Sequence, residues 1–145
     1  MTLSFPPDGL VSELRDQGFK ITTPRYQVIE WVTGQQEDNF TAEEAAAALD
    51  SIGRATVYRT LKLLLDQGLI CRVILNDGGI CYRLSHKGHH HHLVCVSFGA
   101  TEDIHLDDVE NVIQRVREST EYELVGHRLE VYGFCPRCKS AQTGL

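Results

Sequence analysis

Four consecutive histidines, residues 89–92, stand in the interior of the chain and are followed closely by Cys95 in the stretch KGHHHHLVC. Imidazole nitrogens and thiolates are donors that zinc prefers, at about 2.0–2.3 Å. The apolar residues that follow predict a strand over residues 89–97, and side chains alternate between the two faces of a strand. The first and third histidines would then face one way, and the second and fourth the other. We therefore expect one metal ion on each side of this strand, with solvated histidines as the alternative interpretation.

Further potential ligands are spread along the sequence. The five cysteines are an odd number, and Cys135 and Cys138 form a C-x-x-C pair. In a reducing compartment this pattern favours metal ligation or redox chemistry over disulfides. Taken singly, each of the other candidates is more often a surface charge or a core residue than a ligand: Cys71, Cys81, His86, Glu102, Asp103, His105, Glu110 and His127.

Length, charge and hydropathy restrict the class of protein. The 145 residues suffice for one ordinary domain or two very small ones. No apolar run is long enough to cross a bilayer, and residues 1–9 lack the order of a signal peptide, so we expect a cytoplasmic protein without a membrane partner. The formal net charge of −6 weakens a nucleic-acid interpretation without excluding it, because basic residues still bracket two predicted helices.

The first half of the chain has the pattern of a winged helix-turn-helix domain, residues 1–84. Amphipathic or capped segments predict helices at residues 7–18, 22–32, 41–49 and 53–68. Thr23 is the expected N-cap of the second helix, and Thr41 with Glu44 has the spacing of a capping box for the third. Two apolar stretches joined by NDGG predict a hairpin over residues 69–84. A generic small α+β domain is the alternative.

The second half, residues 89–145, predicts a β-α-β domain after a polar hinge, SHKG, at residues 85–88. Strands are expected at residues 89–97, 101–106 and 122–134, with an amphipathic helix at 106–120 and CPRC closing the chain. A domain of this size has a small core, so we expect metal binding or dimerisation to stabilise it. The whole chain is therefore predicted to be α+β, with an N-terminal winged helix-turn-helix domain and a C-terminal β-α-β domain.

An enzyme is not expected. A zinc hydrolase needs an open metal position beside a general base, and the chain has neither an H-E-x-x-H motif nor a glycine-rich catalytic loop. We therefore expect no small-molecule substrate. A metal buffer or chaperone would need the same ligands, but it would not need the segment ATVYRTL or a basic helix face. Those features favour double-stranded DNA as the partner.

Four segments in this order resemble the ferric uptake regulator (Fur) superfamily: ITTPRYQVIEWV, GRATVYRTLKLLLDQGLI, HHHHLVC and HRLEVYGFCPRC. The match spans essentially the whole chain and is most similar to the zinc uptake regulator (Zur) branch. The resemblance implies an N-terminal winged helix DNA-binding domain and a C-terminal α/β dimerisation domain. The protein would be a homodimeric, metal-dependent transcriptional regulator, mainly a repressor, that binds AT-rich inverted-repeat operators of metal homeostasis genes. The resemblance further implies about two or three Zn²⁺ ions per subunit. An iron-, manganese- or peroxide-responsive regulator of the same family is the alternative.

The resemblance also assigns ligands, and two sets lie in the second half. The set beside the dimerisation domain is complete: His89, His91, Glu110 and His127. The structural zinc site matches at three of its four cysteines: Cys95, Cys135 and Cys138. Phe98 stands where the fourth cysteine is expected, so a closed four-cysteine cage cannot form.

The sensing set, which the resemblance places between the domains, departs most from the family pattern. His90, His92 and Asp103 match it, whereas Asn39 replaces a histidine and Arg83 replaces an acidic residue. An arginine cannot ligate a cation. Cys71 and His86 offer a thiolate and an imidazole instead, and such donors with two histidines favour zinc over iron or manganese. The alternative for Cys71 is a buried small hydrophobe, and for Cys81 that interpretation is preferred.

The DNA contacts implied by the resemblance lie around the fourth helix, which would enter the major groove. Thr56, Tyr58 and Arg59 are expected nearest the bases and phosphates, although core packing is the alternative for Tyr58. Lys20 would reach a narrow A·T-rich minor groove, and Arg25 would contact a phosphate.

Overall fold

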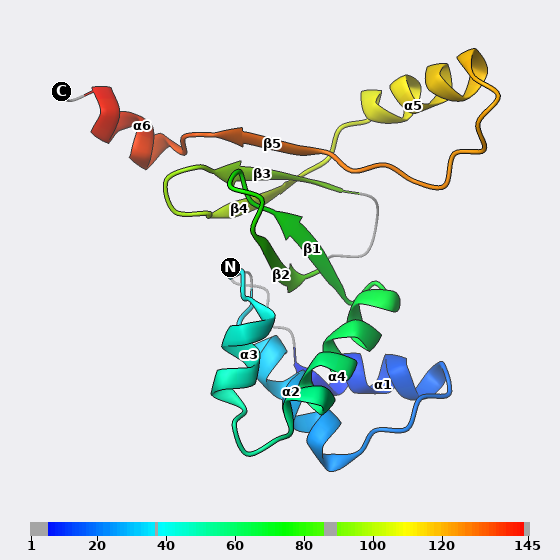
Figure 1. Ribbon diagram of the computed structural model, residues 1–145, viewed down its shortest axis with the longest axis vertical. Coiled ribbons are helices and arrows are strands. Elements are labelled where there is room, and N and C mark those ends of the chain that lie inside the picture. The colour runs from blue at the N-terminus through cyan, green and yellow to red at the C-terminus, as the bar shows by residue number, and fades with distance from the viewer. Residues whose placement is uncertain (1–5, 37, 86–89, 144–145) are drawn as a thin grey trace. The chain divides into compact units, whose positions relative to one another are not determined.

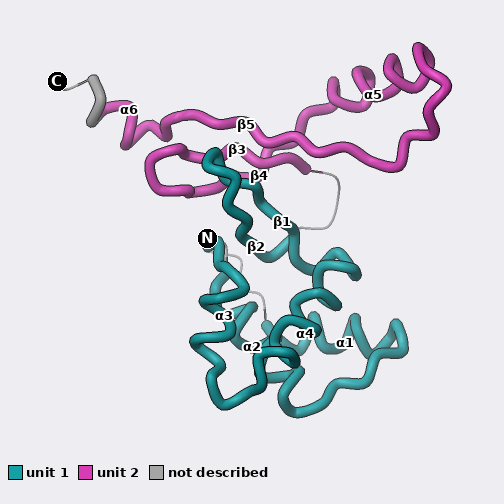
Figure 2. The backbone as a smooth tube through the Cα atoms, viewed as in Figure 1, with its two compact units in different colours: residues 1–87 teal, residues 88–145 magenta. Residues whose placement is uncertain are grey.

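The computed structural model describes residues 6–36, 38–85 and 90–143. The chain divides into two compact units, residues 1–87 and 88–145 (Figure 2). Of the predicted hinge, only Ser85 belongs to the described residues. His86 and His89, both predicted ligands, lie outside them. Each unit combines helices with a small sheet, and the α+β class expected from the sequence is confirmed.

The first unit consists of helices followed by a hairpin, in the order that the sequence predicts. Its described residues form four helices and two strands, labelled in Figure 1: α1 (Pro7–Asp16), α2 (Thr23–Gly34), α3 (Ala42–Ala48), α4 (Arg54–Asp66), β1 (Ile70–Ile74) and β2 (Ile80–Leu84). The two strands are antiparallel, and Cys71 pairs with Arg83. The turn between them contains Gly78 at φ +88°, a conformation that glycine adopts without strain.

The core of the first unit fixes the position of α4. Leu14 from α1, Val28 from α2, and Val57 and Leu64 from α4 are fully buried against one another. The ring of Trp31 meets that of Phe40 edge-on, with centroids 5.3 Å apart. Because the apolar residues of α4 recur at helical intervals, one face of this helix packs inward and the opposite face is left to solvent.

Two side chains cap the helices of the first unit. The Thr41 hydroxyl accepts a hydrogen bond from the Glu44 amide at 3.0 Å, as the predicted capping box requires. The cap of α2 is Thr22 rather than Thr23. Its hydroxyl accepts from the Arg25 amide at 3.3 Å, which places Thr23 inside the first turn of the helix.

The second unit contains a three-stranded sheet with the order β4-β3-β5. Strand β3 (His91–Cys95) pairs antiparallel with β4 (Thr101–Ile104) and parallel with β5 (Glu130–Gly133). The predicted strand over residues 122–134 is too long. Strand β5 covers only the four residues that pair with β3. A helix that the sequence analysis missed, α6 (Pro136–Thr143), begins at the proline of CPRC, a residue suited to the first turn.

Helix α5 (Asp108–Ser119) lies apart from the sheet of its own unit, as Figure 1 shows. None of its residues is buried, although its sequence is amphipathic. Val112 and Val116, one turn apart, are 57% and 40% exposed. An apolar helix face exposed in this way is typical of a surface that another chain covers. No helix in the described ranges is long and apolar enough to span a bilayer.

The buried leucine of α4 provides a test of this core. Leu64→Ala leaves a cavity beneath the helix, and we expect it to destabilise the first unit by about 2–5 kcal/mol. Lys62→Ala on the same helix breaks only an exposed ion pair with Asp66 and should cost less than about 1 kcal/mol. Trp31 is the single tryptophan, so its fluorescence during urea unfolding reports on this unit. Equal urea midpoints for the two variants would contradict the assignment.

Candidate functional site

The histidine run alternates between the two faces of β3. The rings of His90 and His92 lie together, with centroids 5.2 Å apart. His91 instead lies beside His127, at 5.3 Å between ring centroids. The structure describes three of the four histidines, residues 90–92. Among these, the pleat of the strand places neighbouring imidazoles on opposite faces, as the sequence predicts.

Carboxylates flank the face that carries His90 and His92. Asp103 on β4 and Glu130 on β5 are both in register with His92, one on each side of β3. The distance from His90 Nε2 to Asp103 Oδ1 is 4.0 Å, and that from His92 Nδ1 to Glu130 Oε1 is 3.5 Å. These four side chains are between 7% and 13% exposed. The face thus offers nitrogen and oxygen donors of the kind that divalent metals bind.

Burial lowers the pKa of the His92 imidazole, and the hydrogen bond to Glu130 opposes that shift. A lowered pKa favours the neutral ring near pH 7. The neutral form is the one that can ligate a metal, since a protonated imidazole has no lone pair to donate. Sequence analysis named His90, His92 and Asp103 but missed Glu130. The alternation of HRLEVYG placed Glu130 on a strand, but the sequence held no signal that this strand would pair with β3.

The opposite face of β3 carries His91, and His127 from the segment before β5 lies beside it; both are predicted dimerisation-domain ligands. Glu110 lies on α5. Among the described residues, it does not join these two histidines in a set whose donor atoms all lie within 4.8 Å of one another.

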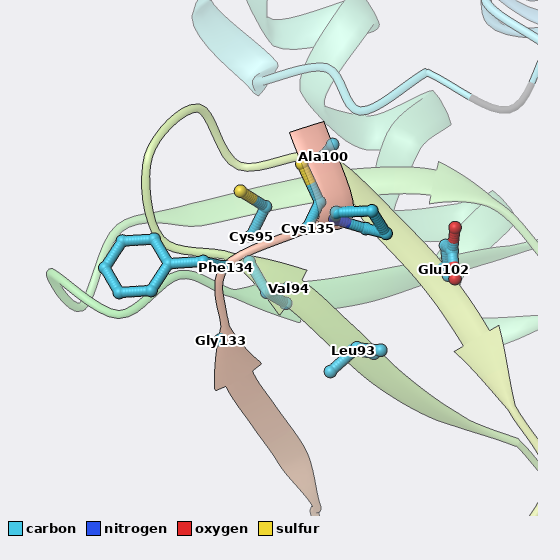
Figure 3. Close-up of a pocket in the computed structure, with 9 residues that line it drawn as sticks. Leu93, Val94, Cys95, Ala100, Glu102, Gly133, Phe134 and Cys135 are labelled. Carbon is cyan, nitrogen blue, oxygen red and sulfur yellow. The ribbon is translucent and has the colours of Figure 1, made fainter. Parts of the chain in front are cut away.

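Three thiols gather at the other end of β3. The sulfur atoms of Cys95, Cys135 and Cys138 all lie within 4.8 Å of one another. Cys95 ends β3, whereas the other two bracket the start of α6, so the parallel pairing of β3 with β5 brings them together. A cavity of about 130 Å³ adjoins them, and Figure 3 shows Cys95 and Cys135 at its edge. Phe98 is 59% exposed. The arrangement fits a metal held by three sulfurs with a fourth donor from elsewhere.

Hydrogen bonds favour the metal-binding form of one of these thiols. The backbone N–H of Cys135 lowers the pKa of Cys95 to about 6, with further contributions from the N–H groups of Ser97 and Phe98. The Cys95 side chain is thus largely a thiolate at neutral pH, which is the form that ligates metals. Burial raises the pKa of Cys138, so this thiol would have to lose its proton when a metal binds.

The wing of the first unit carries Cys71, Cys81 and Arg83. The Cys71 thiol donates to the Arg83 carbonyl at 3.7 Å, directly across the hairpin. Cys81 is buried, its thiol donates to the Val73 carbonyl at 3.8 Å, and burial raises its pKa. These features agree with a structural role for Cys81. Asn39 directly precedes Phe40, whose backbone pairs with Tyr82 next to Arg83.

The predicted DNA contacts of α4 lie on its outer face. Tyr58 is 37% exposed, so it is not a core residue. Its hydroxyl accepts a hydrogen bond from Arg54 at 3.2 Å, and the Arg54 guanidinium lies 5.9 Å from the ring centroid. The exposed Arg59 donates to the Thr56 hydroxyl at 3.3 Å. Tyr58 and Arg59 are therefore available to a partner in solution.

Lys20 and Arg25 are linked before and within α2. The Arg25 guanidinium donates to the Lys20 carbonyl at 2.6 Å, and the Lys20 side chain is exposed. This bond holds the segment before α2 against the first turn of the helix, which fixes two basic residues in one region.

Four helices with a winged hairpin, an exposed basic helix face and clustered metal donors define a class: metal-responsive, DNA-binding transcription regulators. Residues 16–132 match the model of the ferric uptake regulator family, and the chain belongs to this family. Its members are transcription regulators and not enzymes.

Relatives agree with this assignment over nearly the full length. The ferric uptake regulation protein of Legionella pneumophila is 34% identical over 131 residues, covering 88% of this chain and 96% of the relative. The protein of the same name from Bacillus subtilis (strain 168) is 32% identical over 143 residues, covering 94% and 96%.

Solved structures give the same result. The Vibrio cholerae ferric uptake regulator has a TM-score of 0.61 at 32% identity and covers 86% of this chain and 98% of that one. A zinc uptake regulator complexed with zinc and DNA has a TM-score of 0.77 at 19% identity, covering 94% and 95%. At that level of identity the second likeness shows the fold alone.

The three-cysteine cluster yields a prediction. Phe98→Cys places a thiol on the residue whose own backbone N–H already donates to Cys95, so a closed four-sulfur set becomes available. We expect zinc retention against a chelator to rise about tenfold. Phe98→Ser removes the same ring without adding a thiolate and serves as the matched control. Retention that is the same in both variants, measured as zinc content after dialysis, would contradict the assignment.

Proposed function

We propose that this protein is a zinc-responsive, dimeric transcriptional regulator, acting mainly as a repressor at AT-rich inverted-repeat operators of metal homeostasis genes. One observation carries the proposal: in the wing, Cys71 pairs directly with Arg83, the position where the family pattern has an acidic ligand. A thiolate is thus available beside the position at which a carboxylate has been lost. A donor set that exchanges an oxygen for a sulfur favours zinc over iron or manganese.

The proposed sensing ion is held by Cys71, His86, His90 and His92, with Asp103 as a further donor. His90 and His92 share one face of β3, which supports their acting on one ion. One sulfur and three imidazoles form a tetrahedral set suited to Zn²⁺. Zinc would supply Lewis-acid bonding that ties the donors together. The residues themselves supply neutral imidazoles and a thiol that must be deprotonated, so binding strengthens as pH rises.

The exposed apolar face of α5 supports homodimerisation. Val112 and Val116 would be covered by a second copy of the chain, and burying an aliphatic side chain contributes about 1.5–3 kcal/mol. Docking of α5 would also fix Glu110, the third predicted donor of the site that contains His91 and His127. We propose that this site, completed by His89, belongs to the assembled dimer.

DNA binding would use the exposed face of α4 in the major groove. Tyr58 presents an aromatic ring to thymine methyl groups, and Arg59 and Thr56 reach the backbone or base edges. Lys20 would enter a narrow minor groove, where A·T-rich sequence concentrates negative potential, and Arg25 would meet a phosphate. The basic residues lie on exposed or half-buried positions of the first unit, which supports a role outside the core.

Metal binding would control DNA binding through geometry. A dimer reads two half-sites only when its recognition helices are about 34–36 Å apart. An ion that requires donors from both units favours one arrangement of those units over all others. Moving a two-state equilibrium from 1:99 to 99:1 requires about 5.5 kcal/mol of differential binding, which a few extra ligand bonds can provide.

An iron- or manganese-responsive regulator is the second candidate. Asp103 and Glu130 place two carboxylates beside His90 and His92, and oxygen donors suit these metals. Relatives that are 31–36% identical to this chain carry the name ferric uptake regulation protein. A peroxide-responsive variant would need the same oxygen-rich set, and the chain lacks its acidic residue at Arg83.

Single substitutions test the proposed sensing set. We expect Cys71→Ser and His92→Ala each to abolish zinc-dependent binding to an operator in a gel-shift assay while leaving the dimer intact by gel filtration. Cys81→Ala removes the other wing thiol and should bind like the parent, because that thiol is buried and donates to the backbone carbonyl of Val73. Zinc-dependent retention of DNA by both Cys71→Ser and His92→Ala would refute the sensing site.

Metal competition separates the two candidates. With Cys71 supplying a thiolate, we expect Zn²⁺ to activate operator binding at a free concentration far below that needed for Fe²⁺ or Mn²⁺, by about 100-fold or more. The measurement is operator binding by fluorescence anisotropy under anaerobic conditions with buffered free metal. Cys71→Asp should reduce this difference between the activating concentrations of Zn²⁺ and of Fe²⁺ or Mn²⁺, because it restores an oxygen donor. A parent protein that prefers Fe²⁺ would establish the second candidate instead.

A further inference from the structure

Glu130 belongs to none of the donor sets described above, yet it contacts a proposed zinc ligand. Its Oε1 lies 3.5 Å from His92 Nδ1. The contact involves the nitrogen next to the ring attachment and not Nε2. The other carboxylate on this face, Asp103, has its oxygen 4.0 Å from His90 Nε2. In these two contacts the acids approach different histidines.

The backbone fixes this contact. Strands β3 and β5 pair in parallel from His92 with Glu130 to Cys95 with Gly133. Residues directly paired across two strands present their side chains on the same face. Glu130 thus stands beside His92 because of strand register, and not because of a loop conformation. The side chains of His92 and Glu130 are only 7% and 12% exposed, so water competes weakly for the contact.

The chemistry of a neutral imidazole gives this contact a consequence. A neutral ring carries one N–H, and the nitrogen that bears it is set by the hydrogen bond it makes. A carboxylate at Nδ1 selects the tautomer that donates from Nδ1, which leaves the lone pair on Nε2. The two ring nitrogens point to different sides of the ring. A carboxylate held against Nδ1 therefore lies away from an ion bound at Nε2.

We propose that Glu130 is a positioning residue for metal binding: it accepts the Nδ1–H of His92 and presents Nε2 to the sensing ion. Carboxylate–histidine–metal arrangements of this kind fix the ring and increase the basicity of the ligand. The role rests on the proposed function, since it concerns the same sensing ion. It extends the metal centre from the residues that bind the ion to one that prepares a ligand before the metal arrives.

The first measurement uses the full chain without metal. Assigned ¹⁵N NMR resonances of His92 should show the Nδ1–H tautomer in the parent protein. We expect Glu130→Ala to lose this preference, whereas Glu130→Gln should retain it in part because its amide oxygen still accepts. Glu102→Gln is the matched control: it removes one carboxylate from β4 at the position paired with Leu93, one residue along from Asp103, and should leave the tautomer unchanged.

The second measurement is zinc affinity at the site that His92→Ala removes, determined by chelator competition. We expect Glu130→Ala to weaken it by about 10–100-fold, Glu130→Gln by less, and Glu102→Gln not at all. An Nε2–H tautomer in the parent, or unchanged affinity in Glu130→Ala, would overturn the role of Glu130 alone. A parent with no zinc bound at this site would overturn the proposed function and this role together.

The absorption spectrum of the Co²⁺-substituted protein distinguishes positioning from ligation. A spectrum that is the same in the parent and in Glu130→Gln supports positioning, because the coordination sphere is unchanged. A changed coordination geometry in Glu130→Gln, but not in Glu102→Gln, would show that Glu130 binds the ion directly and would overturn the positioning role.

Discussion

Alternation of side chains along one short strand is the constraint on which the metal chemistry of this protein depends. Because β3 is pleated, adjacent histidines cannot converge on one ion, whereas residues two apart can. The two sides of β3 therefore have separate chemistry: His90 and His92 with carboxylates on one side, His91 with His127 on the other. A run of identical residues is thus divided between two different sets of possible metal donors, because the strand gives each face different neighbours.

The same strand also connects the metal sites to the stability of the second unit. This unit has few buried apolar residues, Val94 and Cys95 among them, and its helix α5 contributes none. The three thiols join the end of β3 to the start of α6, and the histidine pair joins β3 to the segment before β5. Metal ions bound by these side chains would hold β3, α6 and the segment before β5 together, where hydrophobic packing alone is weak.

Several predictions of structure that rest on neighbouring residues are confirmed, whereas features that depend on pairing between distant segments were not predicted. The hairpin with its NDGG turn, the cap at Thr41 and the alternation of the histidines follow from residues close together in the chain. The parallel pairing of β3 with β5 joins segments about 40 residues apart, and no local pattern specifies its register. Glu130 was missed for that reason. The helix at α6 was missed because its proline was read as part of a metal motif and not as a helix start.

The distribution of donors between the two units determines which ion can act as a signal. The three thiols all belong to the second unit, as do His91 and His127. A site that lies wholly within one unit binds its ion with the same affinity whatever the arrangement of the two units. A ligand that binds two states equally well does not shift the equilibrium between them. Such ions can stabilise the fold, but they cannot report metal concentration to the DNA-binding helix. In the proposed sensing set, which takes Cys71 from one unit and His90 and His92 from the other, metal binding would depend on the arrangement of the units. Under the proposed function, arginine in place of an acidic ligand at residue 83 would affect the responsive ion, whereas phenylalanine in place of a cysteine at residue 98 would affect only an ion held within the second unit.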